Sequence, residues 1–436
     1  MEKIVSLAKR RGFIFPGSEI YGGLAGTWDY GPLGVELKNN IKREFWKTMV
    51  YEREDTVGLD AAILMNPKVW EASGHTEAFT DPLIECKLCH VRVRADQEDA
   101  VAAHDAEHKK KGEIAVWTEP RQFNLLVEAG LGAVEGEKSK VYLRGEITQG
   151  VHVNFKNVLD STHPKLPFGI VQVGKAFRNE ITPGNFTFRS REFEQMELQY
   201  YVKPEEAERY FDMWKQARMQ WYERLGMKKE NMRFREHSPD ERAHYAKAAW
   251  DIEYHSPIGW KECEGIHNRG DWDLSRHTQF SGEPLTYFDE AEGERLTPYV
   301  IETSGGVDRA ALFFLLDAYF EDGDRVVLKL HPRLAPVKVA VFPLLANKPA
   351  LVEKAREIYK YLQATSYHLQ PLAWDDRGNI GKRYYAQDEI GTPWCVTVDF
   401  ETLENDTVTV RDRDTGTQER INISELAPYF SGKLTL

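Results

Sequence analysis

Cysteine and long apolar runs are both scarce in this sequence. Four cysteines occur in 436 residues, at Cys86, Cys89, Cys263 and Cys395, and they are too few and too unevenly spaced for a disulfide framework in a chain of this length. No window approaches the roughly 18 consecutive apolar residues that a membrane-spanning helix requires, and the first residues lack the apolar core of a signal peptide. We therefore expect a cytoplasmic protein with no membrane partner.

An excess of basic charge is also missing. The sequence has 57 Lys and Arg against 69 Asp and Glu, a net charge of −12. Because indiscriminate binding to nucleic acid depends on neutralising phosphates, this balance excludes a protein that coats nucleic acid. Any contact with nucleic acid must be local. Internal repeats and low-complexity segments are absent as well, so we expect an ordinary globular chain of a few domains.

The clearest regular pattern lies at residues 31–50. Apolar side chains recur there every four residues, at Leu33, Leu37, Ile41, Phe45 and Met49. With Pro32 as a favourable first residue, the spacing predicts a helix with one buried stripe. Periodicity leaves open whether that stripe contacts the chain's own core or a second subunit.

The chain divides near residues 330–336 (LHPRLAP). Beyond this point the sequence predicts a strand (VKVAVFPLL), an amphipathic helix (ALVEKAREIYKYL) and further strands, the last two joined at Asp414-Thr415-Gly416. We expect a compact α/β module over residues 337–436. Residues 86–112 are polar and helix-prone and look like an insertion into a larger domain formed by residues 1–85 and 113–330.

Residues 177–201 (FRNEITPGNFTFRSREFEQMELQYY) predict an antiparallel hairpin with a Pro-Gly turn. Alternation puts Arg178 and Glu180 on one face of the first strand, away from Val171, Val173 and Phe177. On the returning strand it groups Arg191, Phe193, Gln195 and Glu197, away from Met196, Leu198 and Val202. One face is therefore apolar and the other carries guanidinium, carboxylate and aromatic groups. A solvated sheet face with cross-strand ion pairs is the alternative explanation.

Residues 298–320 predict a strand, the pair Gly305-Gly306, and a helix with Arg309 in its first turn. A glycine entry to a helix allows backbone N–H groups and an arginine to converge on phosphate. A plain strand-to-helix turn would have the same pattern. Together with the hairpin, however, this segment supplies the parts of a nucleotide site on an antiparallel sheet.

These segments carry a family resemblance. GPLGVELKNNI, FRNE followed by FRSREF, and SGGVDR resemble the three signature motifs of class II aminoacyl-tRNA synthetases, in that order. SEIYGGLAGTWDYGPLG, GLDAAILMNPKVWEASGH, EQMEL and DEIGTP resemble, more narrowly, the dimeric glycyl-tRNA synthetases. The resemblance implies an α+β fold, with an antiparallel sheet flanked by helices and a C-terminal α/β anticodon-binding domain. It also implies a homodimer that uses ATP with Mg²⁺, glycine and tRNA(Gly).

For the nucleotide, the resemblance implies that Arg178 binds the α-phosphate, Glu180 reads the adenine amino group and Phe193 stacks on the ring. Arg309 would bind the far phosphates, so Arg178 and Arg309 are the expected catalytic residues. The remaining ATP-binding positions that it implies are Asn179, Phe188, Arg189, Glu262, Cys263 and Gly306.

For the amino acid, the resemblance implies a glycine site formed by Arg94, Glu146, Gln195, Glu197, Glu302 and Ser304, with Glu262 nearby. Several carboxylates around one small site repel one another unless a cation lies between them, and the ammonium group of glycine is such a cation. Glycine is also the smallest amino acid, so a wall alone can exclude alanine. No segment suggests an editing domain, and none is needed.

The segment CKLCHVRVRADQEDAVAAHDAEH contains Cys86, Cys89, His104 and His108. The two histidines are four residues apart, and the spacing falls within that known for two-cysteine, two-histidine zinc sites. Many glycyl enzymes have a second CxxC pair, which this chain lacks, so the histidines could replace it as ligands of a structural Zn²⁺. A degraded ribbon without metal is the equal alternative. CKLCH also fits c-type haem attachment, but we expect no export signal, so this alternative is poor.

The segment LRGEITQG departs from the family's usual LRPETAQG at Gly145, Ile147 and Thr148. The departure affects local loop geometry but removes no expected ligand.

The C-terminal module carries a local supply of basic residues at Arg377, Lys382, Arg383, Arg411, Arg413 and Arg420. For any one of them, the simpler expectation is solvation or pairing with Asp376, Asp412 or Asp414.

Three functions are consistent with the sequence. The first is an active glycine–tRNA ligase. The second is a threonyl, prolyl or histidyl enzyme, which the acidic site and EQMEL disfavour. The third is a non-catalytic, synthetase-like accessory protein that binds nucleic acid. Such a protein has no need of ATP ligands, and Arg178, Glu180, Phe193 and Arg309 are all present.

Overall fold

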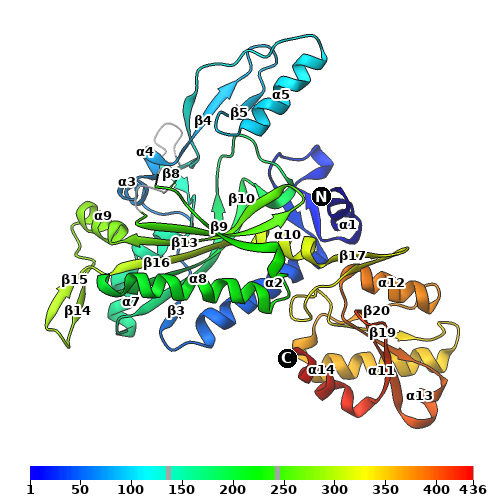
Figure 1. The fold of residues 1–436 in the computed structure, drawn as a ribbon. Coiled ribbons are helices and arrows are strands. Elements are labelled where there is room, and N and C mark those ends of the chain that lie inside the picture. Colours follow the sequence, from blue (N-terminus) through cyan, green and yellow to red (C-terminus); the bar gives the residue numbers. More distant parts are fainter. Residues whose placement is uncertain (134–138, 240, 242–245, 436) are drawn as a thin grey trace.

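The structure is a computed structural model that describes residues 1–133, 139–239, 241 and 246–435 (Figure 1). Its centre is a seven-stranded sheet in the order β11-β12-β13-β16-β10-β9-β3. The strands are β3 (Thr56–Gly58), β9 (Phe168–Phe177), β10 (Glu192–Val202), β11 (Met232–Glu236), β12 (Ala248–Ser256), β13 (Gly259–Gly270) and β16 (Tyr299–Gly306). Neighbouring strands are antiparallel, except that β3 runs parallel to β9.

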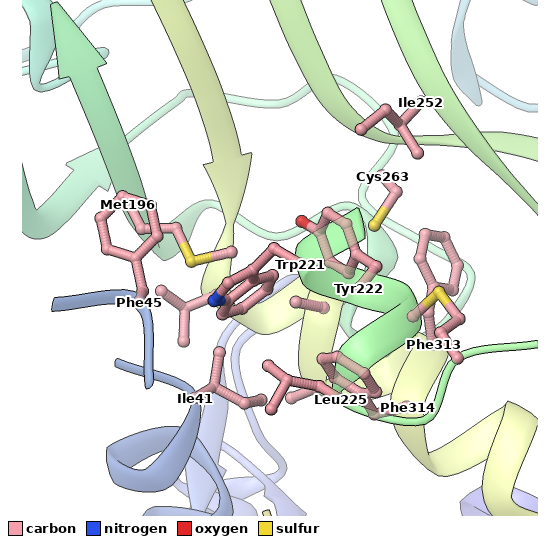
Figure 2. Packing of buried hydrophobic residues seen from close by; sticks show 14 of the residues in the cluster. Ile41, Phe45, Met196, Trp221, Tyr222, Leu225, Ile252, Cys263, Phe313 and Phe314 are labelled. Carbon is pink, nitrogen blue, oxygen red and sulfur yellow. The ribbon is translucent and has the colours of Figure 1, made fainter. Parts of the chain in front are cut away.

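One face of this sheet is covered by α2 (Pro32–Trp46), α8 (Ala207–Arg224) and α10 (Val307–Ala318). The stripe predicted on α2 is buried in the chain's own core, where Leu37, Ile41 and Phe45 lie. Figure 2 shows Ile41 and Phe45 beside Trp221 of α8 and Met196 of β10. The π-helical turn Lys47–Tyr51 extends α2 and carries Met49 into the same core.

The other face of the sheet is covered at one end by α6 (Thr148–His152), α7 (Phe155–Thr162) and α9 (Trp272–Ser281). A second apolar cluster lies there and includes Phe155, Phe168, Tyr201 and Leu274. This cluster leaves the central part of that face to polar side chains.

Residues 80–124 form a smaller unit that projects from the body, coloured cyan in Figure 1. Its sheet has the order β5-β4-β6, with β4 (Thr80–Glu85), β5 (Arg92–Arg94) and β6 (Arg121–Asn124), and the helix α5 (Glu98–Lys110) lies beside it. The strand β5, within the proposed insertion, pairs with β4, which precedes it.

The C-terminal sheet has the order β20-β19-β21-β22-β23. Its strands are β19 (Val339–Pro343), β20 (Ala373–Trp374), β21 (Trp394–Val398), β22 (Thr407–Asp412) and β23 (Gln418–Asn422), and its helices are α11 (Pro349–Thr365), α12 (Ile380–Ile390), α13 (Phe400–Asn405) and α14 (Leu426–Thr435). The strands and the helix predicted here are confirmed, as is the turn at residues 414–416. An apolar cluster between this sheet, α11 and α14 forms a second core.

Ion pairs join this module to the rest of the chain. Arg10 and Arg11, in α1 (Glu2–Arg11), both pair with Glu389 of α12. Arg325 of β18 (Arg325–Leu328) pairs with Asp388 at 2.7 Å.

The remaining short α-helices and strands of the described residues are α3 (Lys68–Ala72), α4 (His75–Ala78), β1 (Ile14–Pro16), β2 (Trp28–Tyr30), β7 (Val127–Leu131), β8 (Ser139–Leu143), β14 (Tyr287–Asp289), β15 (Glu294–Leu296) and β17 (Tyr319–Asp322). Among the described residues, no helix is both long enough and apolar enough to cross a membrane.

Candidate active site

A cavity opens on the polar face of the central sheet. Strand alternation explains its position, because Met196 and Leu198 of β10 enter the core while Gln195 and Glu197 point the opposite way, as predicted. The cavity is lined by Glu146, Thr148, Arg178, Glu180, Thr187, Phe188, Arg189, Ser190, Phe193, Gln195, Glu197, Glu262, Gly265, His267, Glu302, Ser304, Gly306, Asp308 and Arg309.

One end of the cavity is acidic. Register places Glu197 of β10 opposite Ser304 of β16, and His267 of β13 opposite Glu302. Glu146, in the loop before α6, is the third buried carboxylate. Its partner is His75, whose Nε2 lies 3.3 Å from Glu146 Oε2.

The acids at this end differ in their surroundings. Burial acts to raise the pKa of Glu302, but Arg269 and His267 outweigh it and lower that pKa to about 2. Arg269 Nη1 lies 3.0 Å from Glu302 Oε2. Glu146 likewise has a pKa well below its ordinary value, because His75 outweighs its burial.

Glu197 behaves in the opposite way. Burial and the charges of Glu302 and Glu146 raise the pKa of Glu197 to about 8, against the hydrogen bonds from Ser304 and Thr148. Ser304 Oγ donates to Glu197 Oε1 at 2.6 Å and Gln195 Nε2 donates to it at 2.9 Å. A carboxylate that is buried beside like charges is stabilised as an anion when a cation arrives. This end of the cavity therefore favours a small cationic group.

The other end is lined by arginines and aromatic rings. Arg178 donates from Nε to the carbonyl of Gly145 at 3.0 Å, and its guanidinium lies over the ring of Phe193. Arg309 lies over the ring of Phe188 at 4.6 Å. Its Nη1 is 2.9 Å from Glu262 Oε1, and this pairing lowers the pKa of Glu262.

Several buried polar atoms that line the cavity have no hydrogen-bond partner within the described residues. They are Glu180 Oε2, Arg189 Nη1 and Gln195 Oε1. Arg189 Nη1 and Glu180 Oε2 are 3.8 Å apart, too far for a direct hydrogen bond. Buried polar groups usually find partners, so these atoms can take part in recognising a polar ligand.

Three of the residues expected at the site lie elsewhere. Arg94 is outside the cavity lining, and it pairs with Asp81 at 2.7 Å and with Asp96 at 2.6 Å. Asn179 is also outside the lining, and its backbone N–H donates to the carbonyl of Leu125.

The third is Cys263, whose side chain is buried in the core beside Tyr222 and Ile252 (Figure 2). Its orientation follows from a bulge, because Glu262 and Glu264 face consecutive residues of β12 and Cys263 is the extra residue between them. Any contact of this residue with a nucleotide has to come from its backbone.

Sequence reasoning assigned no role to several residues that the site contains. His267 lies in the cavity, and Arg269 supports Glu302 from the same strand. Both follow Gly265 at steps of two on β13, so alternation read from Gly265 could have found them. Thr148 was noted only as a departure from the family pattern.

The four predicted metal ligands come together in the projecting unit. The Sγ atoms of Cys86 and Cys89 and ring nitrogens of His104 and His108 lie within 4.8 Å of one another. Cys89 Sγ is 3.4 Å from both histidine Nε2 atoms, and Cys86 Sγ is 3.7 Å from that of His108. Such spacings suit a tetrahedral ion with bonds of about 2.0 to 2.3 Å.

The fold and the site define the class of protein. The profile of the family "tRNA synthetase class II core domain (G, H, P, S and T)" matches residues 133–319, and that of "Anticodon binding domain" matches residues 338–433. The chain thus has the α+β fold of a class II aminoacyl-tRNA synthetase core, followed by an anticodon-binding domain.

Full-length relatives identify the family within this class. Glycine–tRNA ligases from Borreliella burgdorferi and Caldanaerobacter subterraneus subsp. tengcongensis are each 52% identical over the whole of this chain and cover 97% and 98% of their own lengths. The glycine–tRNA ligase of Thermobifida fusca is 50% identical over the whole chain and covers 98% of its own length. The chain belongs to the glycine–tRNA ligase family.

Proposed function

We propose that this chain activates glycine with ATP and then transfers the glycyl group to the 3′-terminal adenosine of tRNA(Gly). The observation that carries the proposal is the division of one cavity into an acidic end and an arginine end. Glu146, Glu197 and Glu302 form the first, and Arg178 and Arg309 belong to the second. A zwitterion with a small ammonium group and a triphosphate are the ligands that these two ends complement.

Glycine would bind with its ammonium group at Glu197, beside Ser304 and Glu302. The ionised carboxylate then faces the arginine end, where one of its oxygens attacks the α-phosphorus of ATP. A bond forms between that oxygen and phosphorus, and the bond to the bridging oxygen of pyrophosphate breaks. No general base is needed, because the carboxyl group is already ionised at neutral pH.

The arginines act on the charge that develops in this step. Arg178, held at Nε by the carbonyl of Gly145, leaves its terminal nitrogens for the α-phosphate. Arg309 reaches the β- and γ-phosphates from the start of α10. Fixed donors of this kind stabilise the transition state without reorganisation. ATP enters as its Mg²⁺ complex, in which the ion neutralises phosphate charge.

Adenine recognition is assigned to Glu180 and Phe193. Glu180 is 7% exposed, and its Oε2 is one of the buried atoms without a partner among the described residues. An amino group of the base could supply that missing hydrogen bond. Phe193 supplies a planar apolar surface for the adenine ring. The Arg178 guanidinium lies over the Phe193 ring.

The test is ATP–pyrophosphate exchange with each amino acid in turn. Glycine alone should support exchange, and tRNA(Gly) should then accept labelled glycine. Exchange with threonine, proline or histidine instead would identify a different class II enzyme. Absence of exchange with every amino acid would support the non-catalytic accessory protein, which binds nucleic acid without ATP chemistry.

We further propose that the chain works as a cytoplasmic homodimer. The apolar stripe of α2 is buried in the core. The support therefore comes from large apolar side chains that are exposed on α2 and on the short 3₁₀ helix Glu19–Tyr21 between β1 and β2. Val35, Ile20 and Tyr21 are 41%, 89% and 87% exposed. Light scattering on the purified chain should give twice the chain mass, and the mass of a single chain would contradict the proposal.

The domain limits belong to the same proposal. The catalytic domain would span residues 1–85 and 113–330, the insertion residues 86–112 and the anticodon-binding domain residues 337–436, where contact with tRNA is expected.

We also propose a structural Zn²⁺ in the projecting unit, held by Cys86, Cys89, His104 and His108. Besides the clustering of the ligand atoms, Glu113 Oε2 lies 2.7 Å from Nδ1 of His108. This contact places the Nδ1 proton toward the carboxylate and leaves Nε2 to face the sulfur atoms. The ion would fix α5 against the loop that carries the cysteines.

Zinc content tests this site. The purified chain should contain one Zn²⁺, and Cys86→Ser should lose it. His90→Ala is the matched control, because His90 adjoins the cysteines but pairs with Glu85 and should leave zinc content unchanged. A wild-type chain that neither contains nor takes up Zn²⁺ would contradict the proposal.

A further inference from the structure

Thr148 is placed to act on the acidic end of the cavity. It is the first residue of α6, two positions after Glu146, and its side chain is 1% exposed. Its Oγ1 lies 2.7 Å from Oε2 of Glu197 and 3.2 Å from Oε2 of Glu302. The hydroxyl group therefore stands between two carboxylates that come from neighbouring strands.

The hydrogen bonds of the two carboxylates show which one depends on Thr148. Glu302 has other short contacts, with Gln199 Nε2 at 2.8 Å, His267 Nδ1 at 2.8 Å and Arg269 Nη1 at 3.0 Å. The hydrogen-bond donors to Glu197 among the described residues are all neutral, and two of them, Gln195 and Ser304, donate to Oε1.

At Oε2 of Glu197, the other contact among the described residues is Gln199 Nε2 at 3.5 Å. The same amide is 2.8 Å from Glu302. Thr148 is thus the one short donor to this oxygen within the described part of the chain. A hydroxyl group has a single proton to donate, and the shorter distance assigns that proton to Glu197.

We propose that Thr148 is a positioning residue of the glycine site, whose hydroxyl proton holds the Glu197 carboxylate in the orientation that receives the ammonium group. The proposal rests on the proposed glycine activation and deepens it. Without the hydroxyl, Glu197 Oε2 would be buried without a short donor, and the carboxylate could turn away from the ammonium position. The expected consequence is a loss of glycine affinity, with ATP binding left intact.

Two substitutions at Thr148 separate the effect of the hydroxyl donor from the effect of side-chain shape. Thr148→Val keeps the volume and removes the donor, whereas Thr148→Ser keeps the donor and removes the methyl group. A hydrogen bond to a charged group is worth roughly tenfold or more in affinity. In ATP–pyrophosphate exchange, Thr148→Val should raise the KM for glycine by about tenfold and leave the KM for ATP unchanged. Thr148→Ser should stay within about twofold of wild type.

Thr303→Val is the matched control. Thr303 is a buried threonine on β16, next to Glu302, but strand alternation points it away from the cavity. Its Oγ1 has no hydrogen-bond partner among the described residues. This variant should leave the KM for glycine unchanged.

Three results would overturn the proposal. They are an unchanged KM for glycine in Thr148→Val, equal losses in Thr148→Val and Thr148→Ser, and a parallel rise in both KM values, which would indicate a general structural defect. Each of them requires normal exchange by the wild-type chain. A wild-type chain without glycine-dependent exchange would overturn the proposed function, and this inference with it.

Discussion

The arginines of the cavity and those of the C-terminal sheet have different surroundings. In the cavity, the one hydrogen bond of the Arg178 guanidinium to the described part of the chain is from Nε to the carbonyl of Gly145. In the C-terminal module, Arg411 forms two hydrogen bonds with Asp388, at 2.9 and 3.1 Å. Arg383 is fully engaged with backbone carbonyls, among them those of Arg377 and Gly378.

This difference teaches that the count of basic residues does not locate an anion site. The C-terminal sequence contains more clustered arginines than the cavity. However, Arg383, Arg411 and Arg413 are buried, and their N–H groups donate hydrogen bonds to groups within the module. The expectation that these residues pair with neighbouring acids is confirmed for Arg413 and Asp414. An arginine indicates a ligand when its neighbours leave donors unused, as they do for Arg178.

The largest expected effect is the loss of a cavity arginine. Arg309→Ala should reduce glycine-dependent exchange by about 10³-fold or more, because it removes the positive charge assigned to the far phosphates. The chain should stay folded, as judged by circular dichroism. The control is Arg420→Ala, which removes a partly exposed pair with Asp399 in the C-terminal module and should leave exchange unchanged. Normal exchange in Arg309→Ala would refute the phosphate assignment.

A C-terminal pair should affect stability and leave chemistry intact. Asp388→Ala leaves Arg411 and Arg325 without their buried partner, and such losses cost about 3 to 5 kcal/mol in free energy of unfolding. Urea unfolding of the module should report the change, while exchange per folded molecule stays normal. Glu401→Ala removes a half-exposed carboxylate that pairs with the partly exposed Arg420 at 3.0 Å, and it should cost about 1 kcal/mol or less. Equal losses in the two variants would remove the distinction between buried and exposed pairs.

The smallest expected effect is a pH dependence that distinguishes the acidic end of the cavity from the arginine end. Glu197 has its pKa raised to about 8, so it is mostly neutral at lower pH and cannot pair with the ammonium group. The KM for glycine should therefore fall roughly tenfold as pH rises from about 6.5 to about 8. The KM for ATP should stay flat, because arginine does not titrate there.

The charged groups that act on Glu197 among the described residues include Glu302, Glu146 and Arg144, with His267 and Arg269 acting through Glu302. Glu197→Gln should abolish the pH dependence of the KM for glycine. In Glu302→Gln the KM for glycine should still depend on pH. A flat KM for glycine in the wild-type chain would contradict the assignment of Glu197.

Much of the fold, and most of the residues that line the cavity, could be predicted from the sequence for a simple reason. Alternation on a strand separates faces whatever the tertiary context, so Gln195 and Glu197 were correctly placed opposite Met196. The same rule has limits. The bulge at Cys263 changes which residues of β13 face the cavity. No residue in GWKECEG predicts a bulge at this position.

Other features depend on contacts between distant segments. Thr148 meets Glu197 and Glu302 from 49 and 154 residues away, so its position in the chain gave no sign of its partners. Arg94 was placed by resemblance to the family, but Asp81 and Asp96 hold its guanidinium at the edge of the projecting unit. Such pairings emerge only after the chain has folded.

The link between α1 and α12 has a consequence for the molecule as a whole. Arg10 and Arg11 are 54% and 32% exposed at their side chains, and both converge on Glu389. Contacts of this kind are screened by dissolved ions, whereas the buried Asp388 partner of Arg325 is shielded from them. Rising ionic strength should therefore weaken the contact of α12 with α1 before its contact with β18. The attachment of the C-terminal module to the N-terminal helix would then depend on salt.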